Sequence, residues 1–390
     1  MMRLFDYDRA TSLMHGAGID LILASTKSNV SYLLDYYADP CNESMVLDDG
    51  SMYYQSFVGL PSDRHMSSFF TPWIGEVGYM TTSRPWVPNR LVYGEPLDIP
   101  GLKPDEIPVS SNPIECAVKA IQELNLERGC IGLEKTRMPI DSYERLNASL
   151  PRARFVDATP VLSRLRAVKS VEEIDRLRYA TVATEKAVRA GYDSVREGTT
   201  EIEFTRAIEV SLVEQGLECG WIHVAFGPKG ARDIMARDTE AKIGEPLRVD
   251  VGGIHAGYVC DMSRVGVLGS PSPELSIAVE AVREAYQCVR AAVRAGARTG
   301  DLYNLGAQVM QSKGFALFLS SVGHSVGRDV HEWPYLLTNS NDYLLEGMVL
   351  TVEVELRQEG LGCINIEDMV LVTEDGSELI STMDPGLYRI

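Results

Sequence analysis

The spacing of hydrophobic and polar positions changes character near residue 160. Before that point, short apolar runs at residues 19–24 and 130–133 predict buried strands, with helical spacing between them. After it, longer amphipathic stretches come in pairs, and each pair is followed by strands. We therefore expect an α+β protein with two domains, a smaller N-terminal α/β domain over residues 1–160 and a C-terminal domain over residues 161–390.

The C-terminal part contains a weak internal repeat. Residues 195–216 align with residues 293–314, and each stretch joins two helical patterns that are followed by strands. Capping boxes, in which a Ser or Thr is followed three residues later by Glu, mark two helix starts at Ser170 and Thr200. The repeat predicts two related halves, each a helix pair followed by a strand hairpin, with the two hairpins facing each other.

Composition excludes several classes of protein. The chain has 390 residues, a net charge of −18 and a pI near 4.8, so nucleic acid and anionic membrane surfaces would repel it at long range. It has no uninterrupted apolar run of about 18 residues, and its first ten residues lack the pattern of a secretion signal. The seven cysteines form no CxxC pair, which favours reduced thiols in the cytoplasm over a disulfide framework.

Four acidic residues interrupt strand patterns that otherwise predict burial. Asp250 and Asp261 lie on what the pattern predicts to be two arms of a hairpin, LRVDVGGIHAGYVCDMSR, over residues 247–264. An unpaired buried carboxylate costs several kcal/mol or takes up a proton, so two of them suggest a cation, although hairpins with two acids on a solvent face are common. The repeat then predicts polar residues on the matching hairpin, where Glu353 and Glu367 are found.

A loop with two histidines precedes the second hairpin. Residues 323–334, GHSVGRDVHEWP, contain His324 and His331, and glycines around His324 would let the backbone approach a ligand closely. Four carboxylates and an imidazole converging on one cavity would repel one another without cations, and two divalent ions balance four carboxylates. Oxygen-rich ligation with one nitrogen suits Mn, Co, Fe or Zn, and a hydroxide held between two such ions is a strong nucleophile at neutral pH.

The motifs, in this order, resemble those of a known family. DVGGIHAGYVCDMSR, GHSVGRDVHEWP, TVEVEL and INIEDMVLVTEDG are similar to the successive metal-site motifs of the pita-bread (M24) metallopeptidases. The linker LRAVKSVEEIDRLR, with an α/β domain ahead of it, resembles the prolidase, aminopeptidase P and creatinase branch. The resemblance implies a C-terminal pita-bread domain with a pseudo-twofold repeat, a creatinase/prolidase-like N-terminal domain, and a homodimeric, dinuclear-metal Xaa-Pro dipeptidase or aminopeptidase.

The resemblance also implies a role for each matching residue. Asp250 would chelate one ion, His324 and Glu353 would complete the second, and Asp261 and Glu367 would bridge both. Glu353 would also serve as general base, and the second histidine of the loop would stabilise the tetrahedral oxyanion. The pocket for a short peptide or another small molecule would be lined by nearby residues, namely His223, Arg328, His331, Trp333 and Tyr335.

Three positions depart from the family pattern. The histidine that the family has upstream of its first Asp is missing from residues 233–238, where Ile234, Met235 and Ala236 stand. A Pro-Gly pair after the first Glu is replaced by Val354 and Glu355, and an arginine before the last Glu is replaced by Asn365. A complete ligand set with these three changes favours a retained metal centre beside an altered substrate pocket.

Two other classes of function stay open. A metal-held carboxylate or His331 could abstract a proton, as in a lyase of the dimethylsulfoniopropionate type, or the centre could hydrolyse a small non-peptide substrate. A binding module that has lost its activity is the third interpretation, although such relatives usually lose ligands and this chain has all five. Turnover of Xaa-Pro peptides by the metal-loaded protein would separate these classes.

Overall fold

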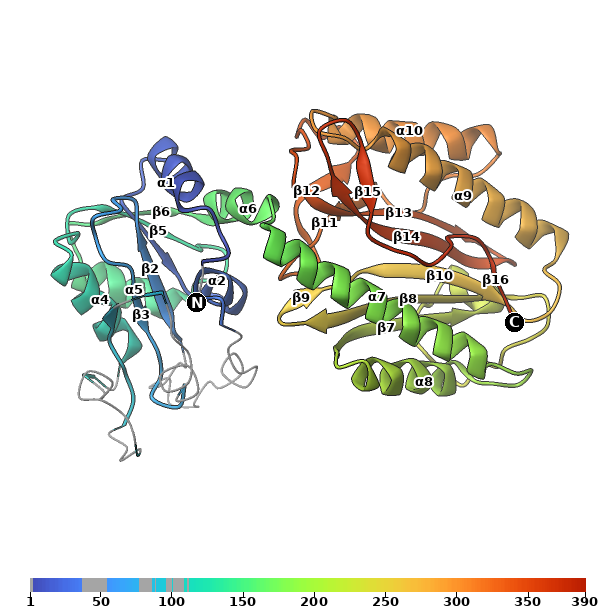
Figure 1. Cartoon of the computed structure of the whole chain (residues 1–390), viewed down its shortest axis with the longest axis horizontal. Helices are drawn as coiled ribbons and strands as arrows, with labels where there is room; N and C mark the ends of the chain where they lie inside the picture. The colour runs from blue at the N-terminus through green and yellow to red at the C-terminus, as the bar shows by residue number, and fades with distance from the viewer. Residues whose placement is uncertain are drawn as a thin grey trace. The chain divides into compact units, whose positions relative to one another are not determined.

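The computed structural model describes residues 3–36, 55–76, 86–87, 89–95, 100, 109–110 and 112–390. The chain divides into two compact units, Met1–Arg166 and Ala167–Ile390, whose elements are labelled in Figure 1. The boundary expected at residue 160 falls inside helix α6 (Thr159–Ala167).

The first unit is a sheet with helices on both faces. Strand β1 (Leu21–Ala24) pairs in parallel with β5 (Cys130–Leu133), which pairs in parallel with β6 (Arg154–Asp157). All four positions of β1 are apolar because both faces of this strand are covered: Ile22 packs with α1 and α2, and Leu23 packs with α4 and α5. The other elements described in this unit are α1 (Tyr7–Gly16), α2 (Lys27–Leu34), β2 (Phe57–Pro61), β3 (Phe69–Thr71), β4 (Asn89–Arg90), α4 (Pro113–Glu123) and α5 (Ile140–Ser149).

Two helix pairs cover the second unit. Helices α7 (Val171–Ser194) and α8 (Glu201–Glu214) pack on its first strands, and α9 (Pro273–Ala292) and α10 (Thr299–Ser312) pack on the later ones. Both predicted capping boxes are confirmed, because the hydroxyls of Ser170 and Thr200 accept hydrogen bonds from backbone N–H groups of the glutamates three residues on, whose carboxylates accept in return. These caps fix where the first helix pair begins.

One sheet carries the strands of both halves. Its order is β12-β11-β13-β14-β10-β8-β7, with β9, β15 and β16 attached at the sides. The β8/β10 hairpin and the β13/β14 hairpin adjoin edge to edge, because β10 pairs with β14 at Ser263 and Glu367. They do not face each other as expected. The bounds are β7 (Glu218–Phe226), β8 (Pro246–His255), β9 (Tyr258–Val259), β10 (Met262–Val267), β11 (Ser321–Ser325), β12 (Glu332–Leu337), β13 (Val349–Gln358), β14 (Gly362–Val372), β15 (Ser377–Leu379) and β16 (Tyr388–Arg389).

Alternation along the strands separates an apolar face from a polar one. In β13, Val352 and Val354 belong to the core that includes α9, so the intervening Glu353 projects from the opposite face. In β8, Asp250 alternates in the same way with the buried Val249 and Val251. The acidic residues of both hairpins therefore share the sheet face that lies opposite the helices.

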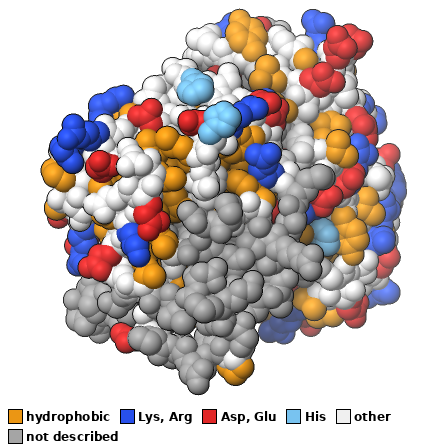
Figure 2. Space-filling model, turned by 60° about the vertical axis from the view of Figure 1, so that its left-hand side comes forward, with side chains coloured by type: hydrophobic (Ala, Val, Ile, Leu, Met, Phe, Trp, Pro, Cys, Tyr) orange, Lys and Arg blue, Asp and Glu red, His pale blue; other side chains and the backbone are white. Residues whose placement is uncertain are grey.

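Charged side chains of both signs are interspersed on the described part of the face that Figure 2 shows. On the face seen in Figure 2, the described Lys and Arg side chains are scattered among Asp and Glu and do not form one basic patch. Within the described ranges, none of the helices is long and apolar enough to cross a membrane.

Candidate metal centre

The strand register brings the predicted acidic ligands into one row. Asp250 on β8 lies opposite Ser263 on β10, Ser263 lies opposite Glu367 on β14, and Glu367 lies opposite Glu353 on β13. Directly opposite residues of an antiparallel sheet project from the same face. Asp261 precedes Ser263 by two residues and shares that face. Acids that are more than a hundred residues apart in the chain thus meet on one surface.

The ligand atoms form two groups of three that share Glu367. One group is Asp261, His324 and Glu367, the other is Asp250, Glu353 and Glu367, and within each group the atoms lie within 4.8 Å of one another. His324 Nε2 lies 3.5 Å from Asp261 Oδ2, and its Nδ1 lies 3.0 Å from the carbonyl oxygen of Ser325. With the proton on Nδ1, that nitrogen donates to the carbonyl, which leaves the Nε2 lone pair for a cation.

Burial and mutual repulsion shift the pKa values of these groups. Desolvation, followed by the charges of Asp250 and Glu353, raises the pKa of Asp261 well above 3.8. Desolvation and the charge of Asp261 do the same for Glu367, and desolvation with Asp250 raises the pKa of Glu353 to about 7. Desolvation lowers the pKa of His324 to about 4, so its imidazole is neutral at pH 7. A divalent cation favours ionised carboxylates and a neutral imidazole, so this donor set fits metal ions.

Asp250 is oriented by two hydrogen bonds. Trp221 Nε1 on β7 donates to its Oδ1 at 2.7 Å, and the Arg248 guanidinium donates to its Oδ2 at 2.5 Å. Each carboxylate oxygen has a second lone pair, so both remain able to bind a cation. Sequence reasoning missed both partners. The signal for Arg248 was its position two residues before Asp250, which places it on the same strand face.

Arg248 is a buried cation inside the acidic face. Its side chain is 1% exposed, and its Nη2 lies 3.9 Å from Glu355 Oε2 as well as beside Asp250. Burial lowers the pKa of the guanidinium, but the charges of Asp250 and the neighbouring glutamates outweigh burial and raise it. Glu355 also pairs with Arg357. The glutamate that replaces the family's glycine is therefore held between two arginines.

Asn365, another departure from the family pattern, contacts a candidate ligand directly. Its Nδ2 donates to Glu353 Oε1 at 2.9 Å, and its backbone lies opposite Glu355 in the β13/β14 pairing. An amide at this position orients Glu353 without adding charge. The positive charge on this face comes from Arg248 on β8 instead.

The second histidine of the loop lies beside the first. The ring centroids of His324 and His331 are 4.2 Å apart, and the Tyr335 ring is 6.3 Å from that of His331. Desolvation lowers the pKa of His331. The structure therefore brings His331 and Tyr335 to the edge of the candidate metal groups.

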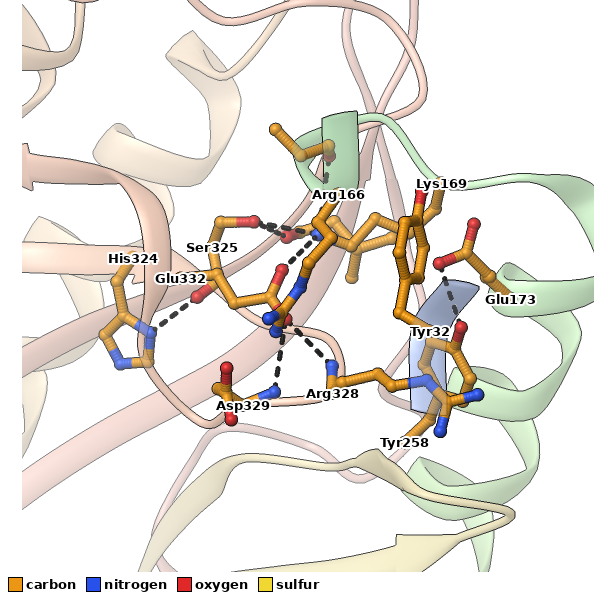
Figure 3. Close-up of polar contacts among 12 residues, drawn as sticks. Tyr32, Arg166, Lys169, Glu173, Tyr258, His324, Ser325, Arg328, Asp329 and Glu332 are labelled. Carbon is orange, nitrogen blue, oxygen red and sulfur yellow. Dashed lines mark hydrogen bonds and ion pairs between the residues drawn. The ribbon is translucent and has the colours of Figure 1, made fainter. Parts of the chain in front are cut away.

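The other predicted pocket residues differ in position. His223 on β7 lies opposite Asp250 and shares its face. Trp333 Nε1 donates to Asp342 Oδ2 at 3.0 Å. The Arg328 guanidinium is stacked 4.7 Å from the centre of the Tyr258 ring, as Figure 3 shows. His223 is thus adjacent to the candidate ligands, while Trp333 and Arg328 are engaged with other side chains.

The segment that lacks the family's histidine is tied to the start of α8. The Glu201 carboxylate is buried and accepts hydrogen bonds from the Arg237 backbone N–H at 2.7 Å and from Lys229 Nζ at 2.7 Å. Lys229 Nζ also donates to the carbonyl oxygen of Met235 at 2.8 Å. These contacts hold residues 233–238 in place without a histidine.

Comparison with known proteins gives matches along nearly the whole chain. The profile of metallopeptidase family M24 matches residues 175–374, and that of the creatinase/prolidase N-terminal domain matches residues 7–168. The Xaa-Pro dipeptidase of Lactobacillus helveticus is 24% identical over 396 residues, which cover 98% of each protein. The Xaa-Pro dipeptidase of Pyrococcus furiosus is 29% identical over 271 residues, which cover 68% of this chain and 78% of that protein.

A solved structure shares the same architecture. The Xaa-Pro dipeptidase from Bacillus anthracis superimposes with a TM-score of 0.82 and 24% identity, over 98% of this chain and 99% of that one. At this identity the likeness shows the fold, which confirms the expected N-terminal α/β domain followed by a pita-bread domain. Because the M24 profile spans half of the chain and the N-terminal profile most of the remainder, the chain belongs to metallopeptidase family M24.

Proposed function

We propose that the protein is a metal-dependent peptidase that hydrolyses Xaa-Pro bonds in dipeptides or short peptides. The observation that carries the proposal is the pair of three-residue groups that share Glu367 on one sheet face. Relatives named as Xaa-Pro dipeptidases match this chain over most of its length. The lyase alternative is not favoured, because the relatives reported above are named as Xaa-Pro dipeptidases.

The ligand roles follow from the grouping. Asp261, His324 and Glu367 would hold one ion, and Asp250, Glu353 and Glu367 would hold another, which places Glu353 with Asp250 and not with His324 as the family resemblance implies. When bound, two divalent ions would polarise the scissile carbonyl and lower the pKa of an attacking water. Manganese is the first ion to test, because four carboxylates and one imidazole form an oxygen-rich set.

Two side chains would handle protons and developing charge. Glu353 would accept the proton of the attacking water, and Asn365 Nδ2 donates a hydrogen bond to its Oε1 at 2.9 Å. His331 has a lowered pKa and is neutral near pH 7, so its N–H would donate to the carbonyl oxygen as negative charge develops there.

The substrate would lie along the same edge of the sheet. His223 and Tyr335 support this placement, since His223 is opposite Asp250 and Tyr335 is beside His331. The Arg328 guanidinium is stacked on the Tyr258 ring, and Trp333 Nε1 is hydrogen-bonded to Asp342. Contact of either side chain with the substrate would compete with these interactions. His223 shares the face of Asp250 and would serve in place of the missing upstream histidine.

Two further properties belong to the proposal, a cytoplasmic location and a homodimer. The described cysteines, which are Cys116, Cys130, Cys219, Cys260, Cys288 and Cys363, are free thiols, and this supports a reducing cytoplasm. A homodimer is expected from the family resemblance, and light scattering of the purified protein would test it.

A peptide panel tests the function. Mn-loaded protein would be assayed on Xaa-Pro dipeptides, longer Xaa-Pro peptides and matched Xaa-Ala dipeptides, with metal content measured on the same samples. We expect turnover of Xaa-Pro substrates well above Xaa-Ala, with the dipeptide-to-peptide ratio separating a dipeptidase from an aminopeptidase. Full metal content with no turnover of any Xaa-Pro substrate would contradict the proposal.

A further inference from the structure

A buried lysine lies between the two histidine-bearing segments. The Lys169 side chain is 1% exposed, and its ammonium donates to Ser325 Oγ at 3.0 Å and to Glu332 Oε2 at 3.3 Å. Ser325 directly follows His324, and Glu332 directly follows His331. One ammonium group therefore contacts the chain neighbour of each histidine, as Figure 3 shows.

Glu332 also shapes the loop between the histidines. Its Oε1 accepts hydrogen bonds from the backbone N–H groups of Arg328 at 2.8 Å and Asp329 at 3.1 Å. A Cβ added at Gly327 would lie only 2.7 Å from the same oxygen, so the backbone is packed closely around this carboxylate. The loop thus turns about Glu332, and Lys169 holds the other oxygen of that carboxylate.

Lys169 is anchored on elements that carry none of the candidate metal ligands. Its backbone N–H donates to the Gly347 carbonyl at 2.9 Å, and its ammonium also donates to the Ala167 carbonyl at 3.3 Å. The next residue, Ser170, caps α7. Lys169 is therefore held by Gly347 and Ala167 as well as by Ser325 on the strand of His324.

The His331 ring depends on the backbone that carries it. Its contacts are with the rings of His324 and Tyr335, at centroid distances of 4.2 Å and 6.3 Å. Over the described ranges of the chain, no group forms a hydrogen bond with this ring. A small shift of the loop would therefore move the imidazole directly.

We propose that Lys169 is a positioning residue that fixes His331 relative to His324 by joining Ser325 to Glu332. The inference rests on the proposed peptidase function, because it assigns Lys169 an effect on the step in which His331 donates to the substrate carbonyl. Of the five candidate ligands, only His324 adjoins a residue that Lys169 contacts, and the four acidic ligands lie on or beside other strands, so we expect metal content to be retained without Lys169. The expected signature is a loss of kcat with metal content unchanged.

The first test compares substitutions at Lys169 with a matched control. K169M removes the ammonium, K169R keeps a cation, and K313M removes a surface lysine that pairs with Glu284 at 2.6 Å. We expect K169M to lower kcat on an Xaa-Pro dipeptide by about 10- to 100-fold, because small misplacements of a reacting group have effects of this size. KM and metal content should stay within about twofold, K169R should recover part of the loss, and K313M should match wild type. Unchanged kcat in K169M would overturn the proposal.

A double-mutant cycle tests whether Lys169 acts through His331. In an H331A background, K169M should lower kcat by less than about threefold, because the group that it positions is already absent. If the K169M effect is as large in H331A as in wild type, Lys169 acts elsewhere and the proposal is wrong.

Two more measurements keep the outcome decisive. K169M removes the buried ammonium beside the Glu332 carboxylate and could fail to fold, so the K169M/E332Q variant, which removes both charges, repeats the assay and should show the same loss of kcat. If the wild type hydrolyses no Xaa-Pro peptide, the proposed function fails, and NMR of histidine-labelled protein then tests positioning alone. The His331 resonances should shift in K169M/E332Q while those of His15 and His65 stay constant; an unshifted His331 would contradict the proposal.

Discussion

At the scale of single residues, the candidate centre is set by which side chains share a strand face with Asp250. The acids there were predictable, because carboxylates inside apolar strand patterns require a partner. Arg248, Trp221 and Lys169 were not assigned from the sequence. Alternation shows that Arg248 shares a face with Asp250, but only the folded structure shows that Glu355 on β13 approaches Arg248 and that Trp221 on β7 donates to Asp250.

Removing the buried guanidinium tests its part in charge balance. R248M should reduce the unfolding free energy of the metal-free protein by about 3–5 kcal/mol, because Asp250 and Glu355 lose a cation that is held in a site 1% exposed. The variant should also bind divalent ions more tightly, since a competing cation is gone. Chemical denaturation and calorimetric titration measure the two effects. R232M, which removes an exposed pair with Glu359, is the control and should change neither.

The raised carboxyl pKa values predict how metal-free protein responds to pH. Glu353 has a folded-state pKa of about 7 against an ordinary value of 4.5, so the folded state binds the proton more tightly. Its contribution to stability is complete below about pH 4.5 and is lost as pH rises through 7, which amounts to about 3 kcal/mol. Asp261 and Glu367 shift in the same direction.

Thermal unfolding between pH 5 and pH 8 checks this expectation. The metal-free protein should unfold at a lower temperature at pH 8 than at pH 5.5. E353Q should weaken that dependence without abolishing it, because Asp261 and Glu367 still titrate, and saturating divalent metal should remove it. A metal-free melting temperature that rises steadily from pH 5.5 to pH 8 would show that these carboxyls do not titrate as described.

At the scale of elements, local signals in the sequence located the helices well. The capping boxes at Ser170 and Thr200 mark the starts of α7 and α8, because each cap is complete within four residues of chain. The edge-to-edge joining of the two hairpins was not predicted. It depends on the pairing of Ser263 with Glu367, which are far apart in the chain, and no local pattern specifies such a register.

Strand β11 offers an element-scale test. Gly323 has φ +137°, and a Cβ there would lie 2.1 Å from the Thr351 carbonyl oxygen. G323A should open the β11/β13 pairing beside His324, cost about 1–3 kcal/mol of stability and weaken metal binding. G314A is the matched control: φ is +83° there and nothing lies within 4 Å of the added Cβ. It should cost about 1 kcal/mol and leave metal binding unchanged. Equal metal affinity in both variants would mean that β11 does not position a ligand.

At the scale of the whole molecule, the internal repeat organises the second unit. Each half supplies a helix pair and a hairpin, and the two hairpins contribute their acids to one face because β10 and β14 are hydrogen-bonded neighbours. The repeat in the sequence was enough to predict that Glu353 and Glu367 would complement Asp250 and Asp261. The sequence could not predict the surroundings of these ligands, because Glu355 contacts Asn365 and Arg248 from two other strands.

The central claim is that this face binds divalent metal ions through Asp250, Asp261, His324, Glu353 and Glu367. Elemental analysis of the purified protein, supported by calorimetric titration of Mn²⁺ into metal-free samples, tests it most directly. We predict about two divalent ions per chain for wild type, with binding lost in D261A and E367A while both variants remain folded. A folded wild-type protein that takes up no divalent ion would contradict the account.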